Sequence, residues 1–197
     1  MKVIVIGAMG TIGSAIVQVI GHRHEVIPVS YSKSVINVDI ADTTSISKMF
    51  ETIGPVDSVI SAAGLAKFGP MTLLTDADFA LSLNNKLMGQ VNLVRFGVDH
   101  IRDNGSFTLT SGILSRKPMN GSTAISLVNS AIEGFVRAAA LEMPRGIRIN
   151  AVSPNWVVDT LEAFNMDPLI GTPVEVIARA YVQVLEGTMN GKVFDAI

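Results

Sequence analysis

The segment from Gly7 to Gly13, Gly-Ala-Met-Gly-Thr-Ile-Gly, joins a short apolar run, Val3–Ile6, to a stretch with helically spaced apolar residues, Thr11–Ile20. Glycines at the three positions permit a tight turn, a close approach of bare backbone to a ligand, and close packing of helix on strand. The free amides and positive dipole of a helix start attract phosphate. The segment therefore predicts a strand–turn–helix unit that binds the pyrophosphate of a dinucleotide.

Beyond this turn, short β-branched runs alternate with longer helical stretches, which is typical of repeated βαβ units. We predict one domain over residues 1–197 with a Rossmann-type α/β fold, a doubly wound, mostly parallel seven-stranded sheet with helices on both faces. The expected strands are Val3–Ile6, Glu25–Val29, Val35–Val38, Val56–Ser61, Ser106–Thr110, Ile147–Val152 and Gly191–Phe194. The expected helices are Thr11–Ile20, Ile46–Ile53, about Thr75–Ile101 (one helix or two, closed by Asn104-Gly105), about Ser122–Glu142, and Pro173–Glu186.

Composition limits the kinds of partner that the chain can have. Hydrophobic residues make up 48% and charged residues 16%, which suits a sheet buried on both faces. The net charge of −2 and the lack of a basic run argue against nucleic acid, and no apolar stretch is long enough for a signal peptide or a membrane span. The chain has no cysteine, which excludes disulfides and suits a cytoplasmic location. His22, His24 and His100 form no plausible metal set, so we expect no metal.

The end of the second expected strand favours NADP over NAD. In an NAD site an Asp or Glu there accepts hydrogen bonds from the adenosine ribose. This chain has Ser30-Tyr31-Ser32-Lys33 instead, which offers hydroxyls and a cation and would suit a 2′-phosphate. We therefore expect Ser30, Ser32 and Lys33 to bind the cofactor; the alternative is that Lys33 is a solvated loop charge.

Several segments, in the right order and spacing, together resemble the short-chain dehydrogenase/reductase family over nearly the whole chain. The resemblance rests on the glycine turn and on Val38–Asp42 (the family's V-D-x-x-D), Ser61–Gly64 (its N-N-A-G), Thr110–Gly112, Ile132–Glu142 and Ile147–Pro154. It implies that Asp39 contacts the adenine, that Ser111 is the catalytic serine, and that Thr160 meets the nicotinamide carboxamide. The expected cofactor-binding residues are Gly7, Met9, Gly10, Thr11, Ile12, Gly13, Ser30, Ser32, Lys33, Asp39, Ala62, Ala63, Gly64, Asn129, Pro154 and Thr160.

The resemblance breaks where the family carries its Tyr-x-x-x-Lys pair. Alignment of the core helix puts Ile125 at the tyrosine position and Asn129 at the lysine position. An isoleucine has no exchangeable proton, so the family's usual acid–base step cannot occur there. Asn129 can still hydrogen-bond a nicotinamide ribose, but it cannot lower a neighbouring pKa as a lysine does. In the region of the family's catalytic asparagine, strict spacing selects Lys86, with Asn85 one residue away.

Two interpretations of this gap stay open. In the first, the chain is an NAD(P)-dependent oxidoreductase acting on a small carbonyl or alcohol. Its catalytic residues would be Ser111, which polarises the carbonyl, Lys86, which supplies charge, and Asn129, with Ser122, Thr123 or water relaying the proton. In the second, it is an inactive NAD(P)-binding sensor or regulator, Lys86 is a helix-surface cation, and Ser111 is an ordinary strand-end hydroxyl.

Two further expectations concern the pocket and assembly. Leu161–Thr172 has only a loop's length where relatives carry a helical lid, so we expect a shallow, open pocket. Small residues on the helix at 122–142 would permit close packing of two copies, and we expect a homodimer or homotetramer through it. The expected pocket-lining residues are Phe68, Met88, Leu114, Met119, Trp156 and Phe164.

Overall fold

The computed structural model describes residues 1–163 and 166–197, and its strands form one sheet with all neighbours parallel. The order is β3-β2-β1-β4-β5-β6-β7, so the connection reverses direction between β1 and β4. This confirms the predicted Rossmann-type sheet. The strands are β1 (Lys2–Ile6), β2 (Glu25–Ser30), β3 (Ile36–Asn37), β4 (Val56–Ser61), β5 (Ile101–Thr110), β6 (Arg148–Pro154) and β7 (Val193–Ala196).

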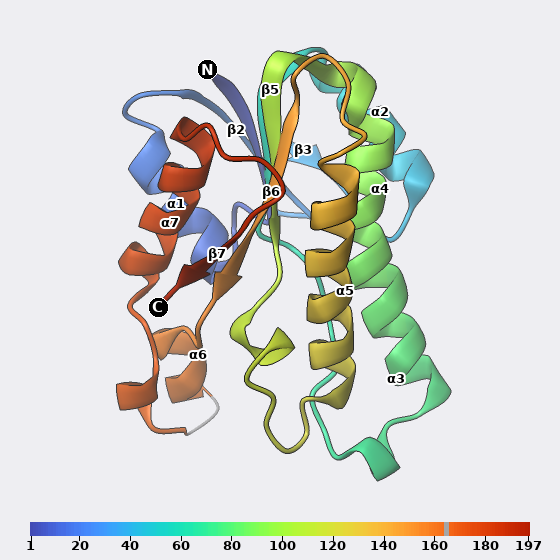
Figure 1. The fold of residues 1–197 in the computed structure, drawn as a ribbon, viewed down its shortest axis with the longest axis vertical. Coiled ribbons are helices and arrows are strands. Elements are labelled where there is room, and N and C mark those ends of the chain that lie inside the picture. The colour runs from blue at the N-terminus through green and yellow to red at the C-terminus, as the bar shows by residue number, and fades with distance from the viewer. Residues whose placement is uncertain (164–165) are drawn as a thin grey trace.

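Helices cover both faces of the sheet (Figure 1). On one face α1 (Thr11–Ile20) packs against α7 (Val174–Glu186), and on the other lie α2 (Thr43–Ile53), α4 (Met88–Gly97) and α5 (Thr123–Ala139). Two short helices, α3 (Asp76–Leu81) and α6 (Val158–Ala163), lie toward the carboxyl end of the sheet. None of the helices in the described ranges is long and apolar enough to cross a bilayer.

The sheet separates two apolar cores. Val3 and Val5 of β1 point to the side of α1 and α7, whereas Ile4 and Ile6 point to the side of α2, α4 and α5. All four side chains are buried because helices cover both faces, which explains the uninterrupted apolar run in this strand.

The helical stretch after Thr75 ends at His100, close to the predicted boundary, but the strand that follows begins earlier than predicted. It comprises α3, a π-helical segment from Ser82 to Leu87, α4 and a short 3₁₀ turn, and β5 already begins at Ile101. The Asn104-Gly105 pair therefore does not close the helix but lies inside β5. Asn104 has a φ of 61°, its N–H donates to the Arg145 carbonyl at 2.9 Å, and the β4–β5 register shifts nearby. Residues typical of a turn here form a bulge in a strand.

The segment after β6 is also more regular than predicted. The expectation of a bare loop over Leu161–Thr172 is wrong, because α6 begins at Val158 and a 3₁₀ turn spans Pro168–Ile170. A bridge between Val157 and Thr172 holds the two ends of this segment together. Phe164, predicted to line the pocket, lies outside the described residues.

Candidate functional site

The three glycines of the first turn each have a separate geometric reason. Gly7 has a φ of 83°, and a Cβ there would lie 2.5 Å from the Ala62 carbonyl oxygen, because the end of β4 passes close by. A Cβ on Gly13 would overlap the Gly7 carbonyl, since α1 packs directly on the turn. A Cβ on Gly10 would touch only the Gly7 oxygen, at 3.4 Å, which leaves its other side open to a ligand.

The start of α1 offers its amides to that open side. Gly10 is the N-cap and has no side chain to accept hydrogen bonds from the first turn, so among the described residues no side chain caps the amides of Thr11, Ile12 and Gly13. Bare amides beside a glycine-lined hollow fit a pyrophosphate.

A cavity of about 660 Å³ opens beside this turn, at the carboxyl ends of β1, β2 and β4. It lies where the connection of the sheet reverses, the position at which open α/β sheets bind ligands. Ten of the predicted cofactor residues line it: Gly7, Met9, Gly10, Ser30, Ser32, Lys33, Asp39, Ala62, Ala63 and Gly64.

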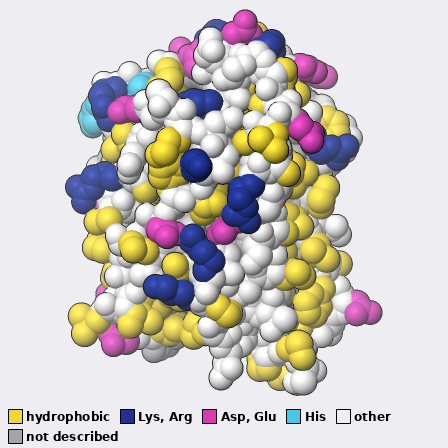
Figure 2. All heavy atoms as spheres, viewed as in Figure 1, with side chains coloured by type: hydrophobic (Ala, Val, Ile, Leu, Met, Phe, Trp, Pro, Cys, Tyr) yellow, Lys and Arg dark blue, Asp and Glu magenta, His cyan; other side chains and the backbone are white. Residues whose placement is uncertain are grey.

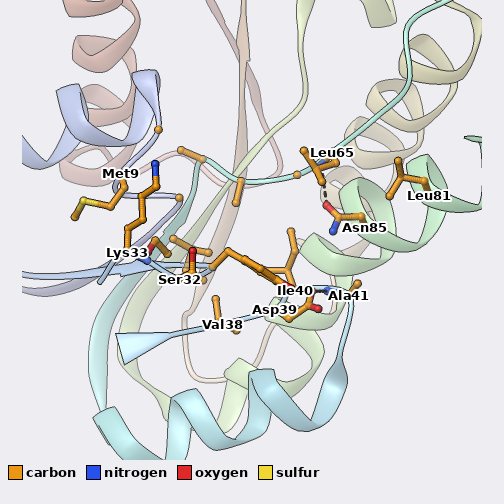
Figure 3. Close-up of a pocket in the computed structure, with 18 residues that line it drawn as sticks. Met9, Ser32, Lys33, Val38, Asp39, Ile40, Ala41, Leu65, Leu81 and Asn85 are labelled. Carbon is orange, nitrogen blue, oxygen red and sulfur yellow. Dashed lines mark hydrogen bonds between the residues drawn. The ribbon is translucent and has the colours of Figure 1, made fainter. Parts of the chain in front are cut away.

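The β2 end of this cavity carries the predicted phosphate-binding groups (Figure 3). The Ser30 hydroxyl accepts the Lys33 N–H at 2.8 Å and so shapes the turn, while the Lys33 side chain extends along the pocket toward the side on which Met9 lies. Lys33 has no carboxylate within ion-pair distance in the described part of the chain. The Asp39 carboxylate accepts the Ala41 N–H at 2.9 Å, so it closes a turn as well as lining the cavity.

The opposite end of the cavity is closed by residues that the sequence analysis did not assign to the cofactor. Leu65, Leu81 and Asn85 lie there, and the Asn85 side-chain oxygen accepts the Leu65 N–H at 2.7 Å (Figure 3). The local signal for Asn85 was its place beside Lys86, but its bond to a loop twenty residues earlier has no signature in the sequence.

A second cavity, of about 340 Å³, adjoins the first, and Gly64 lines both. It brings Lys86, Ser111 and Asn129 together with Ile125. Its remaining lining is Ile12, Gly64, Thr110, Gly112, Ile113, Leu114, Pro154, Asn155, Trp156, Val157 and Thr160. We call this the inner pocket.

The other predicted residues lie around these two cavities. Thr11 borders a separate surface hollow with Met9 and Gly10, and Gly13 lies beneath the turn. Of the expected pocket-lining residues, Leu114 and Trp156 line the inner pocket, Phe68 lies edge-on to Trp156 with ring centroids 6.2 Å apart, and Met88 and Met119 lie outside it. Ser122 is also outside, because its hydroxyl donates to the Met119 carbonyl at 2.7 Å.

Lys86 reaches the inner pocket from the π-helical segment. π-Helical turns are uncommon and are often found at functional sites. The Lys86 backbone and stem pack against Gly64, and its ammonium donates to the Ser111 carbonyl oxygen at 3.2 Å. Burial lowers the pKa of Lys86 to about 8, because the surrounding protein disfavours the charged form. Lys86 is therefore a partly buried amine that lines the inner pocket, which favours a role in the site over that of a solvated helix-surface cation.

Asn129 presents an unpartnered acceptor. The residue is 2% exposed, and its side-chain nitrogen donates to the Gly112 carbonyl at 3.5 Å. In the described part of the structure its side-chain oxygen has no hydrogen-bond partner, although it is buried. Such an acceptor costs free energy unless a donor reaches it, and a ribose hydroxyl is a donor of suitable kind. Ile125, one helical turn earlier, lines the same pocket.

Ser111 directs its hydroxyl to a carboxylate that the sequence analysis did not single out. Its Oγ donates to the Glu133 carboxylate at 3.2 Å, with the Val152 carbonyl at 3.4 Å. The same Glu133 oxygen accepts from the Ser115 hydroxyl at 2.6 Å. The available signal was an acidic residue four positions after Asn129 on the buried side of the core helix, where charges are rare.

Comparisons with known proteins agree with this geometry. A family model described as enoyl-(acyl carrier protein) reductase matches residues 17–170. A hydroxynaphthalene reductase from Aspergillus fumigatus is 30% identical over 127 residues, which cover 62% of this chain and 46% of that protein. A versicolorin reductase from Emericella nidulans is 28% identical over 78% of this chain and 68% of that one. The chain spans about half the length of the first of its curated relatives.

Solved structures resemble the chain over its full length. A protein from Listeria innocua, lin1944, has a TM-score of 0.97 with 39% identity and full coverage of both chains. A small-chain dehydrogenase solved in complex with NADPH has a TM-score of 0.87 with 28% identity, over 99% of this chain and 95% of that one. The family model, the parallel sheet and the motifs around both cavities lead to one conclusion: this chain belongs to the short-chain dehydrogenase/reductase family.

Proposed function

We propose that the chain is an NAD(P)-dependent oxidoreductase that interconverts a small carbonyl compound and its alcohol, with Lys86 as the proton donor. The observation that carries the proposal is the partly buried amine of Lys86, which donates to the Ser111 carbonyl in the inner pocket that Ile125 also lines. An acid with a pKa near the operating pH is suited to general acid–base catalysis, and Ile125 has no proton to offer.

The cofactor assignment is supported by the fit of the residues. The open side of Gly10, the uncapped amides of α1 and the unpartnered Asn129 oxygen are spaced along two joined cavities. NADP is favoured over NAD, because Lys33 supplies a cation at the end of β2 and the chain has no carboxylate at Ser30–Lys33. The NADPH complex of a 28% identical small-chain dehydrogenase points the same way.

The chain's own residues then divide the work as follows. When bound, the nicotinamide supplies the hydride. The Asn129 side-chain oxygen would accept a hydrogen bond from a ribose hydroxyl and so hold that end of the cofactor. The Lys86 ammonium donates a hydrogen bond to the substrate oxygen and passes its proton to that oxygen as the carbonyl is reduced. In the reverse direction the neutral amine accepts the alcohol proton.

The test begins with binding and then asks for turnover. NADPH and NADH are titrated by fluorescence and calorimetry, and hydride transfer is screened against a panel of small ketones and aldehydes. Lys86→Met should lower kcat by about 10²-fold or more while NADPH binding stays within twofold. Lys48→Met, on the exposed side of α2, is the matched control and should leave both unchanged. Unchanged turnover in Lys86→Met would remove Lys86 from the mechanism.

The rival function is an inactive NAD(P)-binding sensor or regulator, and Ile125 is the observation that favours it. Tight NADPH binding without turnover on any carbonyl would support it. It would gain further support if Ile125→Tyr combined with Asn129→Lys created activity, because the pair would restore the missing acid–base group.

Assembly and location are also proposed. Leu127, Gly134 and Ala138 lie exposed on α5, and a Cβ on Gly134 would meet nothing within 4 Å, so a second copy could approach this helix closely. A homodimer or homotetramer through α5 remains a prediction, which light scattering on the purified chain tests. A cytoplasmic location likewise remains a prediction.

A further inference from the structure

Gln90 of α4 is a fully buried amide near the inner pocket that the proposed mechanism does not use. The residue is 0% exposed. Its side-chain oxygen accepts the Thr110 N–H at 2.8 Å, and its side-chain nitrogen donates to the Thr110 carbonyl at 2.9 Å. Two hydrogen bonds to the backbone of one residue fix both the position and the plane of the amide. Gln90 therefore joins α4 to the last residue of β5.

This contact completes the sheet where β4 has ended. The last residue of β4 is Ser61, whose carbonyl accepts from the Thr110 hydroxyl. The Ser111 N–H donates to the Val152 carbonyl of β6 at 2.9 Å. Successive residues of a strand direct their backbone groups to opposite sides, so those of Thr110 face the β4 side. Gln90 supplies the partners that a longer β4 would have given, and without them two buried backbone groups would be unsatisfied.

The same amide also holds the helical turn that carries Lys86. Its nitrogen makes a further hydrogen bond, to the Lys86 carbonyl at 3.3 Å, while the Lys86 ammonium donates to the Ser111 carbonyl at 3.2 Å. The backbone and the ammonium of Lys86 are thus both tied to the end of β5, at the consecutive residues Thr110 and Ser111. Gly64 packs on the stem between them, since a Cβ there would lie 2.9 Å from Lys86 Cγ.

A lysine that transfers a proton needs such a fixed base. The side chain is long and flexible, and the donor must lie within hydrogen-bond reach of the substrate oxygen. Lys86 also extends from the π-helical segment, whose turns are wider than those of an α-helix. A shift of this segment along β5 would move the amine relative to the pocket, and a misplacement of about 1 Å is enough to slow a reaction strongly.

We propose that Gln90 is a positioning residue, which sets the place of the Lys86 amine in the inner pocket by fixing the π-helical segment to the end of β5. Its meaning for catalysis rests on the proposed oxidoreductase function. Gln90 is not among the described residues that line the two joined cavities. Its effect on the reaction must therefore pass through Lys86, and cofactor binding should not depend on it.

The first experiment asks whether Gln90 acts through Lys86. Gln90→Met keeps the length of the side chain and removes its hydrogen bonds, and Gln90→Asn keeps the amide but is too short to span the same contacts. Each variant should lower kcat for carbonyl reduction about 10-fold or more, with KM and NADPH affinity within about twofold, at temperatures well below unfolding. The matched controls, Gln183→Met and Gln183→Asn on the exposed side of α7, should equal the wild type.

The double variant Lys86→Met with Gln90→Met makes the test specific. It should be no slower than Lys86→Met alone, because a positioning residue has nothing left to position. Losses that multiply in the double variant overturn the proposal. An unchanged kcat in a folded Gln90→Met or Gln90→Asn protein also overturns it, even if the melting temperature falls.

The second experiment needs no turnover, because it follows the Lys86 pKa by NMR of labelled lysine side chains. The Lys86 signal is assigned by its loss in Lys86→Met. In Gln90→Asn, water should reach the displaced amine, so its pKa should rise from about 8 toward 10.5, the ordinary value. A pKa that stays at about 8 or falls in the folded variant overturns the proposal. A wild type that binds NADPH but reduces nothing sinks the oxidoreductase function, and this measurement still decides what Gln90 does.

The substitution at Gln90 changes no charge around the amine. Basic and acidic side chains on the face shown in Figure 2 are gathered over β7 and the adjoining side of α5. There Arg116 pairs with Glu133 and with Asp195. Because Gln90 is neutral and belongs to α4, its replacement leaves this cluster intact. A changed pKa of Lys86 would therefore report a changed position of the amine.

Discussion

The two joined cavities are built by different means. The larger one is formed by backbone: the glycines of the first turn, the uncapped amides of α1 and the ends of β1, β2 and β4. The inner pocket is formed by side chains from separate elements, with Lys86 from the π-helical segment, Ser111 from the end of β5 and Asn129 from α5. A site formed by backbone depends on local sequence and on steric limits. A site formed by side chains depends on contacts between segments that are distant in the sequence. The larger cavity can therefore lose its function when one glycine gains a methyl group. The inner pocket can lose its function when one side chain loses its charge or its exchangeable proton.

The largest expected effect is on cofactor binding, when the glycine turn of the larger cavity is disrupted. Gly13→Val would drive a branched side chain into the Gly7 carbonyl, so the turn and α1 would have to move apart. We expect NADPH affinity to fall at least about 100-fold and the melting temperature to drop by about 5 °C or more. Calorimetry and thermal unfolding measure the two effects. Gly134→Ala, whose Cβ meets no atom within 4 Å, is the control and should retain wild-type binding. Full NADPH affinity in Gly13→Val would show that the cofactor binds elsewhere.

This contrast also explains how much could be predicted from the sequence. The strand–turn–helix unit at Gly7–Gly13 and the seven-stranded Rossmann-type sheet depend on spacing and periodicity, and both were predicted correctly. The Asn104-Gly105 pair was misread, because the same residues serve a turn after a helix and a bulge within a strand. The ambiguity between Asn85 and Lys86 arose in a π-helical segment, where the wider turn changes which side chains share a face.

Glu133 shows why the rest of the site could not be predicted from the sequence. Its partners, Ser111 and Ser115, lie 22 and 18 residues earlier in the chain, on a strand end and a 3₁₀ turn. Only the packing of α5 against β5 and β6 brings these groups together. The sequence showed an acidic residue in a helix but not that its charge points inward.

The second prediction tests the inner pocket through pH. Burial lowers the pKa of Lys86 to about 8. Carbonyl reduction needs the protonated amine, so its kcat should be constant below this value and fall as pH rises through about 8. Alcohol oxidation needs the neutral amine and should rise over the same range. Stopped-flow rates at saturating substrate measure both directions. Parallel profiles for the two directions would contradict proton transfer by Lys86.

A smaller effect is expected at the β2 end of the larger cavity. Lys33→Ala should weaken NADPH about 10-fold and leave NADH within twofold, because only NADPH carries the 2′-phosphate that the ammonium would pair with. Titrations of both cofactors at the same ionic strength give the ratio, and Lys48→Ala is the surface control. An equal loss for both cofactors would indicate that Lys33 lies near the pyrophosphate, which NADPH and NADH both carry. It would contradict the proposal that Lys33 selects NADP.

The smallest expected effect is on the stability of Lys86→Met. This variant should lose activity but should be more stable than the wild type. Below pH 8 the folded protein holds the Lys86 side chain charged in a partly buried position, while the unfolded chain holds it charged in water. Between pH 8 and about 10.5, the ordinary pKa of a lysine, the unfolded state binds more protons, so the cost of burial disappears as pH rises through this window. Lys86→Met should therefore raise the melting temperature at pH 7 by about 2–4 °C, and the gain should shrink toward pH 10.5. Thermal unfolding of both proteins across this range measures the difference.

A gain that does not depend on pH would reflect better packing of methionine and not the removal of a buried charge. A pH-dependent gain together with lost turnover would show that the inner pocket sacrifices stability to keep an amine where a proton is needed.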